Sequence, residues 1–269
     1  MGCAANNDME EILESFCTPP APEETDYDRK ALEGAVLGAV RSEARTLVTY
    51  TWGEGKGVLL AHGWGSRASH MALIARGLAR RGFRAVAFDA PAHGRSRMHG
   101  GSPLSNGFEF GLAIRAVADA AGPFTAVIAH SLSAAAAVWV TAGLGANAPG
   151  RRPVEKLVLL STPAGINQLM QYYCARTGRN WEELKQALER EFSCRTDDYQ
   201  VEDSLAATGA RILMIHDEED AEAPVATALD AARAVPTVKL VLTKGLGHGR
   251  VLAARETLRC ILSFLENGE

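Results

Sequence analysis

Ser131 is the residue of this sequence best suited to covalent chemistry. A serine hydroxyl is a weak nucleophile near neutral pH, and it needs an adjacent base that a carboxylate orients. Later in the chain stand a histidine flanked by glycines, His248, and four consecutive acidic residues, 217–220. These residue types together indicate nucleophilic catalysis by a serine.

The segments on either side of Ser131 would hold it on a sharp turn. Residues 124–129 are a short apolar run, which predicts a strand buried on both faces, and the Ala-rich residues 133–144 predict a buried helix. Ser131 would then stand at the carboxyl end of the strand, where ligands of open α/β sheets bind. Amides at the start of the helix would face the same point and favour an oxyanion. The alternative is that Ser131 only caps the helix.

Strand and helix patterns alternate through most of the chain. Helical periodicity covers residues 67–81 and 110–121, and residues 31–40 are expected to form a further short helix. This alternation requires right-handed crossovers and predicts the α/β class with a mainly parallel sheet. The predicted strands are residues 47–52, 58–61, 85–88, 124–129, 157–160, 212–215 and 240–242.

Two segments depart from this alternation. Residues 1–28 are acidic and rich in proline, which indicates an N-terminal extension with one short helix. Residues 164–208 show two helical patterns and no strand, and the second is capped by Asn180 with Glu183 three residues later.

The turn around Ser131 resembles the nucleophile elbow of the α/β-hydrolase superfamily, which reads G-x-S-x-G. The local sequence is Ala129-His130-Ser131-Leu132-Ser133, so a small residue replaces each glycine. These positions must be small because strand and helix nearly touch there. Residues 89–96 resemble a structural turn of the same superfamily, and the resemblance extends over about residues 47–265.

An early loop resembles the H-G-x-G segment of this superfamily. It reads His62-Gly63-Trp64-Gly65 and follows a predicted strand. The resemblance implies that the backbone N–H groups of Trp64 and Leu132 form an oxyanion hole. His62 is expected to stabilise this loop.

Two late loops resemble the remaining parts of the superfamily's site. Residues 216–220 resemble its H-G-x-x-D turn, which implies that Asp220 is the acid of a triad. Asp217 and Glu219 remain alternatives, and so does a solvated acidic turn. Residues 245–248 resemble its G-x-G-H turn, which implies that His248 is the base.

The resemblance implies an α/β-hydrolase fold with an eight-stranded sheet and a helical lid. The expected parts are an N-terminal extension at 1–44, a core at 45–163 and 208–269, and a lid at 164–207, although ordinary packing helices would explain the last segment too. The implied activity is hydrolysis of a carboxylic ester or thioester by Ser131, without metal or organic cofactor. His62, Met170 and Tyr173 are candidates for the substrate pocket.

Composition narrows the classes of partner. The chain has 269 residues, 47% of them hydrophobic, and a net charge of −4, which provides no basic surface for nucleic acid or anionic membrane. Five cysteines without metal-site spacing and no secretory signal predict reduced thiols in the cytoplasm. We expect a small-molecule acyl substrate and no membrane association, and the oligomeric state cannot be read from the sequence.

Two other functions remain open at this point. The same scaffold supports peptidase, amidase, lactonase, acyltransferase and carbon–carbon hydrolase chemistry, and fold alone does not choose among them. The second is a non-catalytic binding protein, which the missing elbow glycines would favour if Ser131 could not reach His248.

Overall fold

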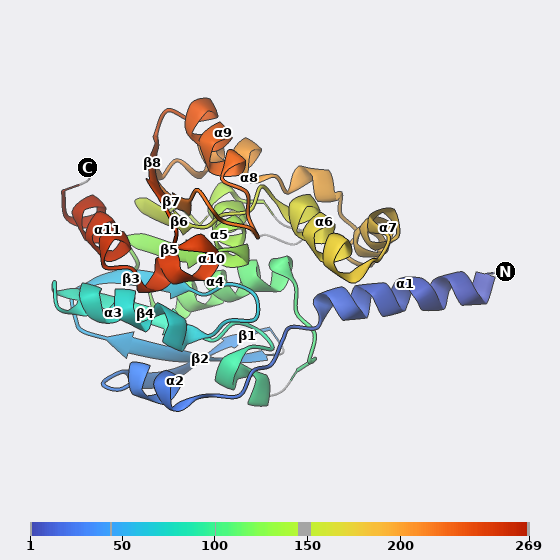
Figure 1. The fold of residues 1–269 in the computed structure, drawn as a ribbon. Coiled ribbons are helices and arrows are strands. Elements are labelled where there is room, and N and C mark those ends of the chain that lie inside the picture. Colours follow the sequence, from blue (N-terminus) through green and yellow to red (C-terminus); the bar gives the residue numbers. More distant parts are fainter. Residues whose placement is uncertain (1, 44, 100, 145–151, 268–269) are drawn as a thin grey trace.

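The computed structural model describes residues 2–43, 45–99, 101–144 and 152–267, with side chains from Glu10 onward. Its strands form one eight-stranded sheet in the order β1-β2-β4-β3-β5-β6-β7-β8 (Figure 1). β2 pairs antiparallel with both β1 and β4, and the other neighbours pair in parallel. The predicted α/β class with a mostly parallel sheet is confirmed. The strands are β1 (Val36–Ser42), β2 (Arg45–Trp52), β3 (Lys56–Ala61), β4 (Phe83–Phe88), β5 (Ala126–His130), β6 (Lys156–Leu160), β7 (Arg211–Asp217) and β8 (Val238–Thr243).

Helices cover both faces of this sheet. α3 and α11 pack on one face, and α4, α5, α8 and α9 pack on the other. The helices are α1 (Gly2–Cys17), α2 (Asp26–Ala31), α3 (Ala72–Ala79), α4 (Gly107–Ala121), α5 (Leu132–Ala142), α6 (Ile166–Thr177), α7 (Trp181–Glu191), α8 (Val201–Thr208), α9 (Ala226–Ala234), α10 (Gly247–Arg250) and α11 (Arg255–Asn267). Short 3₁₀ helices are η1 (Ala68–Met71), η2 (Gly94–Met98), η3 (Thr196–Asp198) and η4 (Val251–Ala253).

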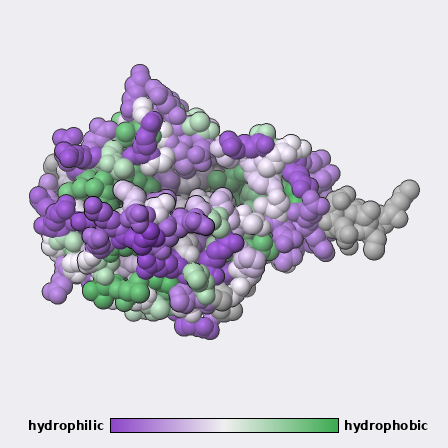
Figure 2. Space-filling model, turned by 60° about the horizontal axis from the view of Figure 1, so that its bottom comes forward, coloured by the Kyte–Doolittle hydropathy of each residue, from purple (hydrophilic) through white to green (hydrophobic). Residues whose placement is uncertain are grey.

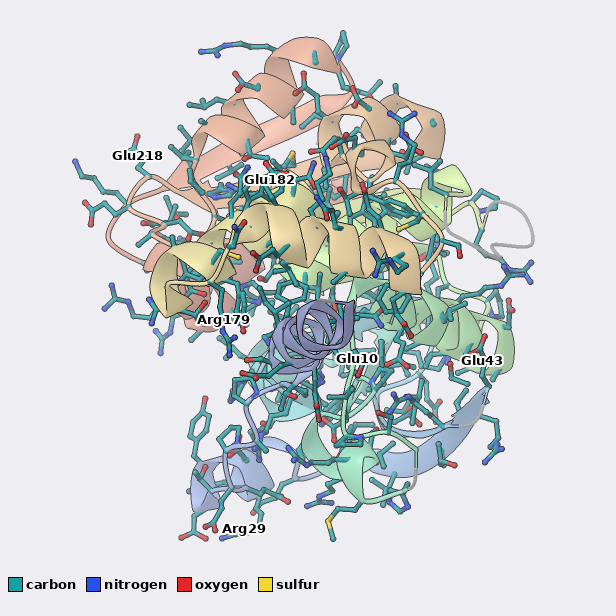
Figure 3. The ribbon with its side chains drawn as sticks, turned by 90° about the vertical axis from the view of Figure 1, so that its right-hand side faces the viewer. Glu10, Arg29, Glu43, Arg179, Glu182 and Glu218 are labelled. Atoms are coloured by element: carbon teal, nitrogen blue, oxygen red, sulfur yellow. The ribbon has the colours of Figure 1, made fainter. Side chains whose placement is uncertain are left out.

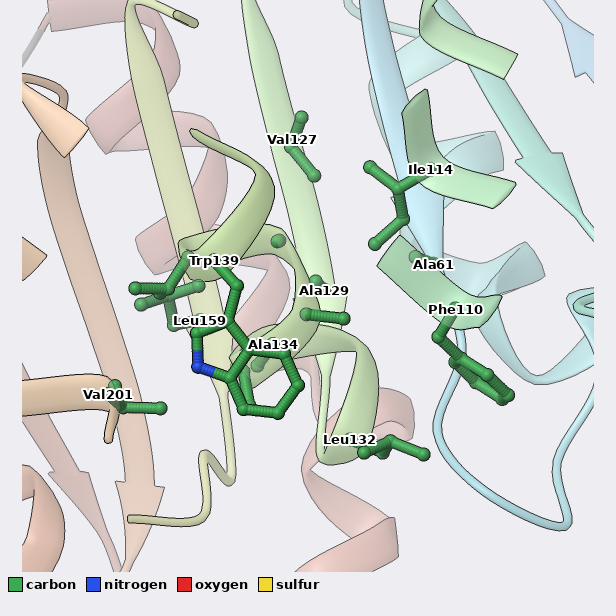
Figure 4. Packing of buried hydrophobic residues seen from close by; sticks show 14 of the residues in the cluster. Ala61, Phe110, Ile114, Val127, Ala129, Leu132, Ala134, Trp139, Leu159 and Val201 are labelled. Carbon is green, nitrogen blue, oxygen red and sulfur yellow. The ribbon is translucent and has the colours of Figure 1, made fainter. Parts of the chain in front are cut away.

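The central strands are apolar throughout because successive side chains enter two different cores. In β3, Leu59 belongs to the core beneath α4 and α5, and Leu60 belongs to the core beneath α3 and α11. Figure 4 shows the first core, in which Leu132 and Trp139 of α5 lie over β5. Residues 134–137 of α5 are all buried alanines, so this helix can approach the sheet closely.

The helix predicted for residues 31–40 is wrong. α2 ends at Ala31, and Val36–Ser42 forms the edge strand β1. The first four residues of β1 are exposed, so no alternation of apolar residues marks it in the sequence. The extended conformation of β1 comes from its pairing with β2. The two strands are so close at Gly38 that an added Cβ would lie only 2.8 Å from Thr49 Oγ1. A contact between separate segments thus overrides the local helical preference.

Residues 164–208 contain three helices where the sequence predicts two. α6 and α7 correspond to the predicted pair, and the Asn180 side chain accepts hydrogen bonds from the amides of Glu182 and Glu183. The third helix, α8, packs against α5 and α9. Among the three helices between β6 and β7, α8 is thus the one that packs with the helices covering the sheet.

The N-terminal helix α1 packs beside α7, as the view along α1 in Figure 3 shows. Glu11 forms an ion pair with Arg179 at 2.7 Å. The hydroxyl of Tyr173 donates to Ser15 Oγ at 2.7 Å, and its ring contacts Phe16 edge to face. The expected N-terminal extension is thus folded against the helices of the expected lid.

Beyond α1, the chain runs to α2, where the side chain of Asp28 is buried. Its carboxylate accepts hydrogen bonds from Thr25 and from Ser69 Oγ at 2.5 Å, and it lies 3.7 Å from Arg67. Burial alone would raise the pKa of Asp28, but these hydrogen bonds and the Arg67 charge lower the pKa to about 2. Asp28 therefore fastens the N-terminal segment to η1 as a charged group.

The surface carries both hydrophilic and hydrophobic side chains. The face shown in Figure 2 is largely hydrophilic, with smaller hydrophobic areas between the charged side chains. Within the described ranges, no helix combines the length and the apolar character that a membrane crossing requires.

The Asp28 contacts predict a pH-dependent effect on stability. Asp28→Asn should lower the free energy of unfolding by about 2 kcal/mol at pH 7, because the pKa of the folded state lies below that of the unfolded chain. Since the folded pKa is depressed, this contribution is complete above about pH 5 and disappears as the pH falls through about 2, with about half remaining at pH 3. Urea titrations at pH 7 and pH 3 would measure it.

The matched control is Asp26→Asn in the same helix, because the side chain of Asp26 is 99% exposed. This variant should change the unfolding free energy by less than about 0.5 kcal/mol. Equal losses in the two variants at pH 7 would contradict the role assigned to Asp28.

Candidate active site

Ser131 sits on a strained turn between β5 and α5. Its backbone has φ 55° and ψ −125°, a conformation that non-glycine residues rarely adopt. The Ser131 amide donates to the carbonyl of Leu160 at 2.9 Å, which fixes the turn to the neighbouring strand β6. The helix begins at the next residue, so the predicted abrupt reversal of the chain is present.

The two residues that replace the elbow glycines fit this turn. Ala129 is fully buried in β5. Ser133 is also fully buried, and its hydroxyl donates a short hydrogen bond to the carbonyl of His62. The hydroxyl that a glycine would lack therefore connects the elbow to the loop after β3.

His248 reaches Ser131 from the loop after β8. Its Nε2 lies 2.9 Å from Ser131 Oγ, within hydrogen-bond reach. Gly245 and Gly247 have φ of 77° and 61°, so this loop needs residues without a Cβ to bend the backbone over the sheet. The structure thus brings together the two residues that the sequence places 117 positions apart.

Asp220 is the carboxylate that contacts His248. Its two oxygens lie 2.9 and 3.1 Å from His248 Nδ1. Nδ1–H therefore donates to Asp220, which leaves Nε2 free to accept the proton of Ser131. Burial would raise the pKa of Asp220, but the hydrogen bond from His248 and those from the amides of Ala223 and Glu222 lower it to about 2. Asp220 is thus held in its charged form.

The alternative acid, Asp217, faces elsewhere. Its Oδ2 accepts hydrogen bonds from Thr243 Oγ1 at 2.8 Å and from the Leu246 amide at 2.9 Å. Burial would raise the pKa of Asp217, but the hydrogen bond from the Thr243 side chain and those from backbone amides outweigh burial and lower it. Asp217 thus braces the loop that carries His248. The remaining alternative, Glu219, has its amide hydrogen-bonded to Asp217 Oδ1 at 3.0 Å.

The loop after β3 lies directly against the elbow. A Cβ at Gly63 would lie 2.9 Å from the Cβ of Ser131, so only glycine lets the loop come this close. The amides proposed for the oxyanion hole belong to Trp64 in this loop and to Leu132 at the start of α5. Among the hydrogen bonds of the described residues, neither amide has an acceptor. Their part in an oxyanion hole stays a prediction.

Two buried histidines hold this loop in place. His62 Nδ1–H donates to the Gly63 carbonyl at 2.7 Å, and its Nε2 accepts from the Ala90 amide at 3.0 Å. His93 Nε2 accepts from the Gly65 amide at 3.0 Å, a contact that no local sequence pattern indicates. Burial lowers the pKa of each histidine to about 3, so both are neutral.

The three residues suggested for a substrate pocket occupy different positions. His62 is buried within the loop after β3, and Met170 is fully buried in the core beneath α6. The Tyr173 hydroxyl is bonded to Ser15 of α1. Their part in substrate binding stays a prediction. In the described part of the chain, no three His, Cys, Asp or Glu side chains are grouped so that they could hold a metal ion.

Comparison with known proteins agrees with this fold. The model of the alpha/beta hydrolase family matches residues 58–259. No curated protein matches the sequence.

Solved structures with the same fold include three hydrolases of low sequence identity. The Pyrococcus furiosus esterase Pf2001 is 18% identical, with a TM-score of 0.65, and the match covers 93% of this chain and 96% of the esterase. A bacterial membrane phospholipase A is 16% identical, with a TM-score of 0.66 and coverage of 98% and 92%. The serine hydrolase CCSP0084 from Cycloclasticus zankles is 17% identical, with a TM-score of 0.65 and coverage of 87% and 99%.

At these identities the solved structures establish a shared fold only. The family model carries the assignment, because it spans most of the sequence, from β3 to α11, and includes Ser131, Asp220 and His248. The chain belongs to the alpha/beta hydrolase family.

Proposed function

We propose that this protein is a serine hydrolase that cleaves a carboxylic ester or thioester through an acyl-enzyme intermediate. The observation that carries the proposal is the continuous hydrogen-bonded series from Asp220 through His248 to Ser131 Oγ, with contacts of 2.9 Å on each side of the imidazole. A nucleophile, a base and an orienting carboxylate in this order are the parts that serine acyl transfer needs.

In the acylation step, Ser131 Oγ attacks the carbonyl carbon of the substrate while His248 Nε2 takes the hydroxyl proton. The carbonyl electrons move to the oxygen, and the amides of Trp64 and Leu132 stabilise the resulting oxyanion. The intermediate then collapses, and His248 returns its proton to the departing alcohol or thiol. Asp220 stays charged throughout and stabilises the imidazolium that forms transiently.

In the deacylation step, water takes the place of the leaving group. His248 removes a proton from the water, whose oxygen attacks the acyl carbon. Collapse of the second intermediate breaks the bond to Ser131 Oγ, which recovers its proton from His248, and releases a carboxylic acid. We infer a small-molecule acyl substrate, since the net charge of −4 offers no broad attraction for nucleic acid.

The contact of 2.9 Å between Ser131 and His248 also bears on the binding-protein alternative. That alternative requires an elbow whose serine cannot reach the base. Ala129 and Ser133 leave Ser131 within reach, so catalysis is the better supported of the two functions. Amide, lactone and acyl-transfer chemistry would use the same residues, and activity assays must separate them.

Labelling with a fluorophosphonate tests whether Ser131 is activated. The reagent should modify wild-type protein at Ser131, because His248 can remove the hydroxyl proton, and Ser131→Ala should abolish both labelling and ester hydrolysis. Mass spectrometry of peptides would locate the adduct, and matched ester, thioester and amide substrates would define the scissile bond.

Ser161→Ala is the matched control, because Ser161 is also a buried serine at a strand end, with φ 49°. This variant should still be labelled at Ser131. A folded wild-type protein that resists a reagent proven on another serine hydrolase would refute the proposal and favour the binding-protein alternative.

Replacing the two aspartates separately tests the assignment of the acid. Asp220→Asn should reduce kcat by about 10³- to 10⁴-fold, because an amide neither fixes the required tautomer nor stabilises the imidazolium. Asp217→Asn should mainly lower the midpoint of thermal unfolding and reduce kcat far less, since the Asp217 carboxylate bonds to Thr243 and to the amides of Leu246 and Glu219 and not to His248. Steady-state kinetics with thermal melts would measure both, and the reverse ranking of kcat would reassign the acid to Asp217.

A further inference from the structure

His130 is a buried titratable residue beside the proposed nucleophile that the mechanism above does not use. It is the last residue of β5, immediately before Ser131, and its side chain is almost fully buried. Its Nδ1 has no hydrogen-bond partner in the described part of the chain. A polar ring at this position therefore needs a reason beyond filling space.

The other ring nitrogen contacts the backbone of His248. His130 Nε2 lies 2.9 Å from the carbonyl oxygen of His248. Because a carbonyl oxygen only accepts, Nε2 must carry the proton and Nδ1 must be bare. One hydrogen bond thus joins the strand that carries the nucleophile to the residue that supplies the base.

The His130 ring is packed closely on two sides. The rings of His130 and His248 have centroids 4.9 Å apart. On the other side, a Cβ at Gly63 would lie 2.9 Å from His130 Nδ1. The imidazole therefore fills the space between the loop that carries the base and the loop that carries Trp64.

His130 also has to remain uncharged in this position. Burial, with a further contribution from the nearby His248, lowers the pKa of His130 to about 3. A neutral ring can donate to the His248 carbonyl without placing a second cation beside the imidazolium that forms during catalysis.

We propose that His130 is a positioning residue, whose Nε2–H holds the His248 backbone so that the His248 imidazole meets Ser131 Oγ. This inference rests on the proposed serine chemistry. Its alternative is that the ring merely packs between two loops. If His130 positions His248, a substitution must keep a hydrogen-bond donor near Nε2 to keep activity. If the ring only packs, a substitution needs to keep only the volume of the side chain.

Two variants separate these cases. His130→Gln places an amide N–H near the position of Nε2, whereas His130→Leu keeps an apolar side chain without a donor. We expect His130→Leu to reduce kcat by about 10- to 100-fold with little change in KM, because the base is misplaced in the reacting geometry. Labelling of Ser131 should slow by a similar factor, and His130→Gln should restore most of both rates.

Nitrogen-15 NMR of the histidine rings supplies a readout that does not depend on turnover. In the wild type, His130 should have a protonated Nε2 and a bare Nδ1 from pH 5 to pH 8. In His130→Leu, the proton on His248 Nδ1 should exchange with solvent faster, and His130→Gln should slow the exchange again. Thermal melts would verify that both variants are folded.

Several results would overturn the inference. Wild-type kcat in a folded His130→Leu variant would do so, and so would equal loss of kcat in the two variants, which indicates packing alone. A bare Nε2 in the wild type would also refute it. If wild-type Ser131 is not labelled, the proposed hydrolase function fails, and the exchange rates of the His248 proton still decide whether His130 positions that loop.

Discussion

The close contact between β5 and α5 is the constraint on which the rest of the site depends. Ser131 must reverse the chain between them with φ 55°, a strained conformation that costs on the order of 1–3 kcal/mol. The surrounding packing maintains it: residues 134–137 of α5 are buried alanines, and the Ser131 amide is bonded to β6. The reversal brings the hydroxyl, the first amide of α5 and the loop after β3 together at one edge of the sheet.

Neutral buried histidines form a second level of support around this turn. His62 and His93 each form a hydrogen bond with the backbone of the loop after β3, and His130 forms one with the backbone of His248. An imidazole suits this task because it can donate at one nitrogen and accept at the other, and burial keeps it uncharged. His248 differs from these three because both of its nitrogens face side chains, Asp220 and Ser131. The hydrogen-bond partners of each imidazole thus distinguish the supporting histidines from the proposed base.

The N-terminal segment extends this support beyond the sheet. α1 lies against α7, Asp28 fastens α2 to η1, and Glu24 pairs with Arg95 at 2.6 Å. Pro20 lies beside Gly65, where an added Cβ would meet the proline ring at 3.3 Å. The N-terminal segment therefore contacts the loop after β3. A region that the sequence marks only as acidic and proline-rich is part of the packing around the site.

The class of fold, the approximate positions of seven strands and the order in which Ser131, Asp220 and His248 follow their strands could be predicted from the amino-acid sequence. These features are local: apolar runs, small residues around Ser131 and glycines around one histidine can be read within a few residues. Tertiary contacts were needed to see that Val36–Ser42 is a strand and that Asp220 rather than Asp217 contacts His248. They were also needed to see that Ser133 bonds to the loop after β3 and His130 to the loop after β8. Each of these depends on partners distant in sequence or on side-chain direction, and local composition contains no information about either.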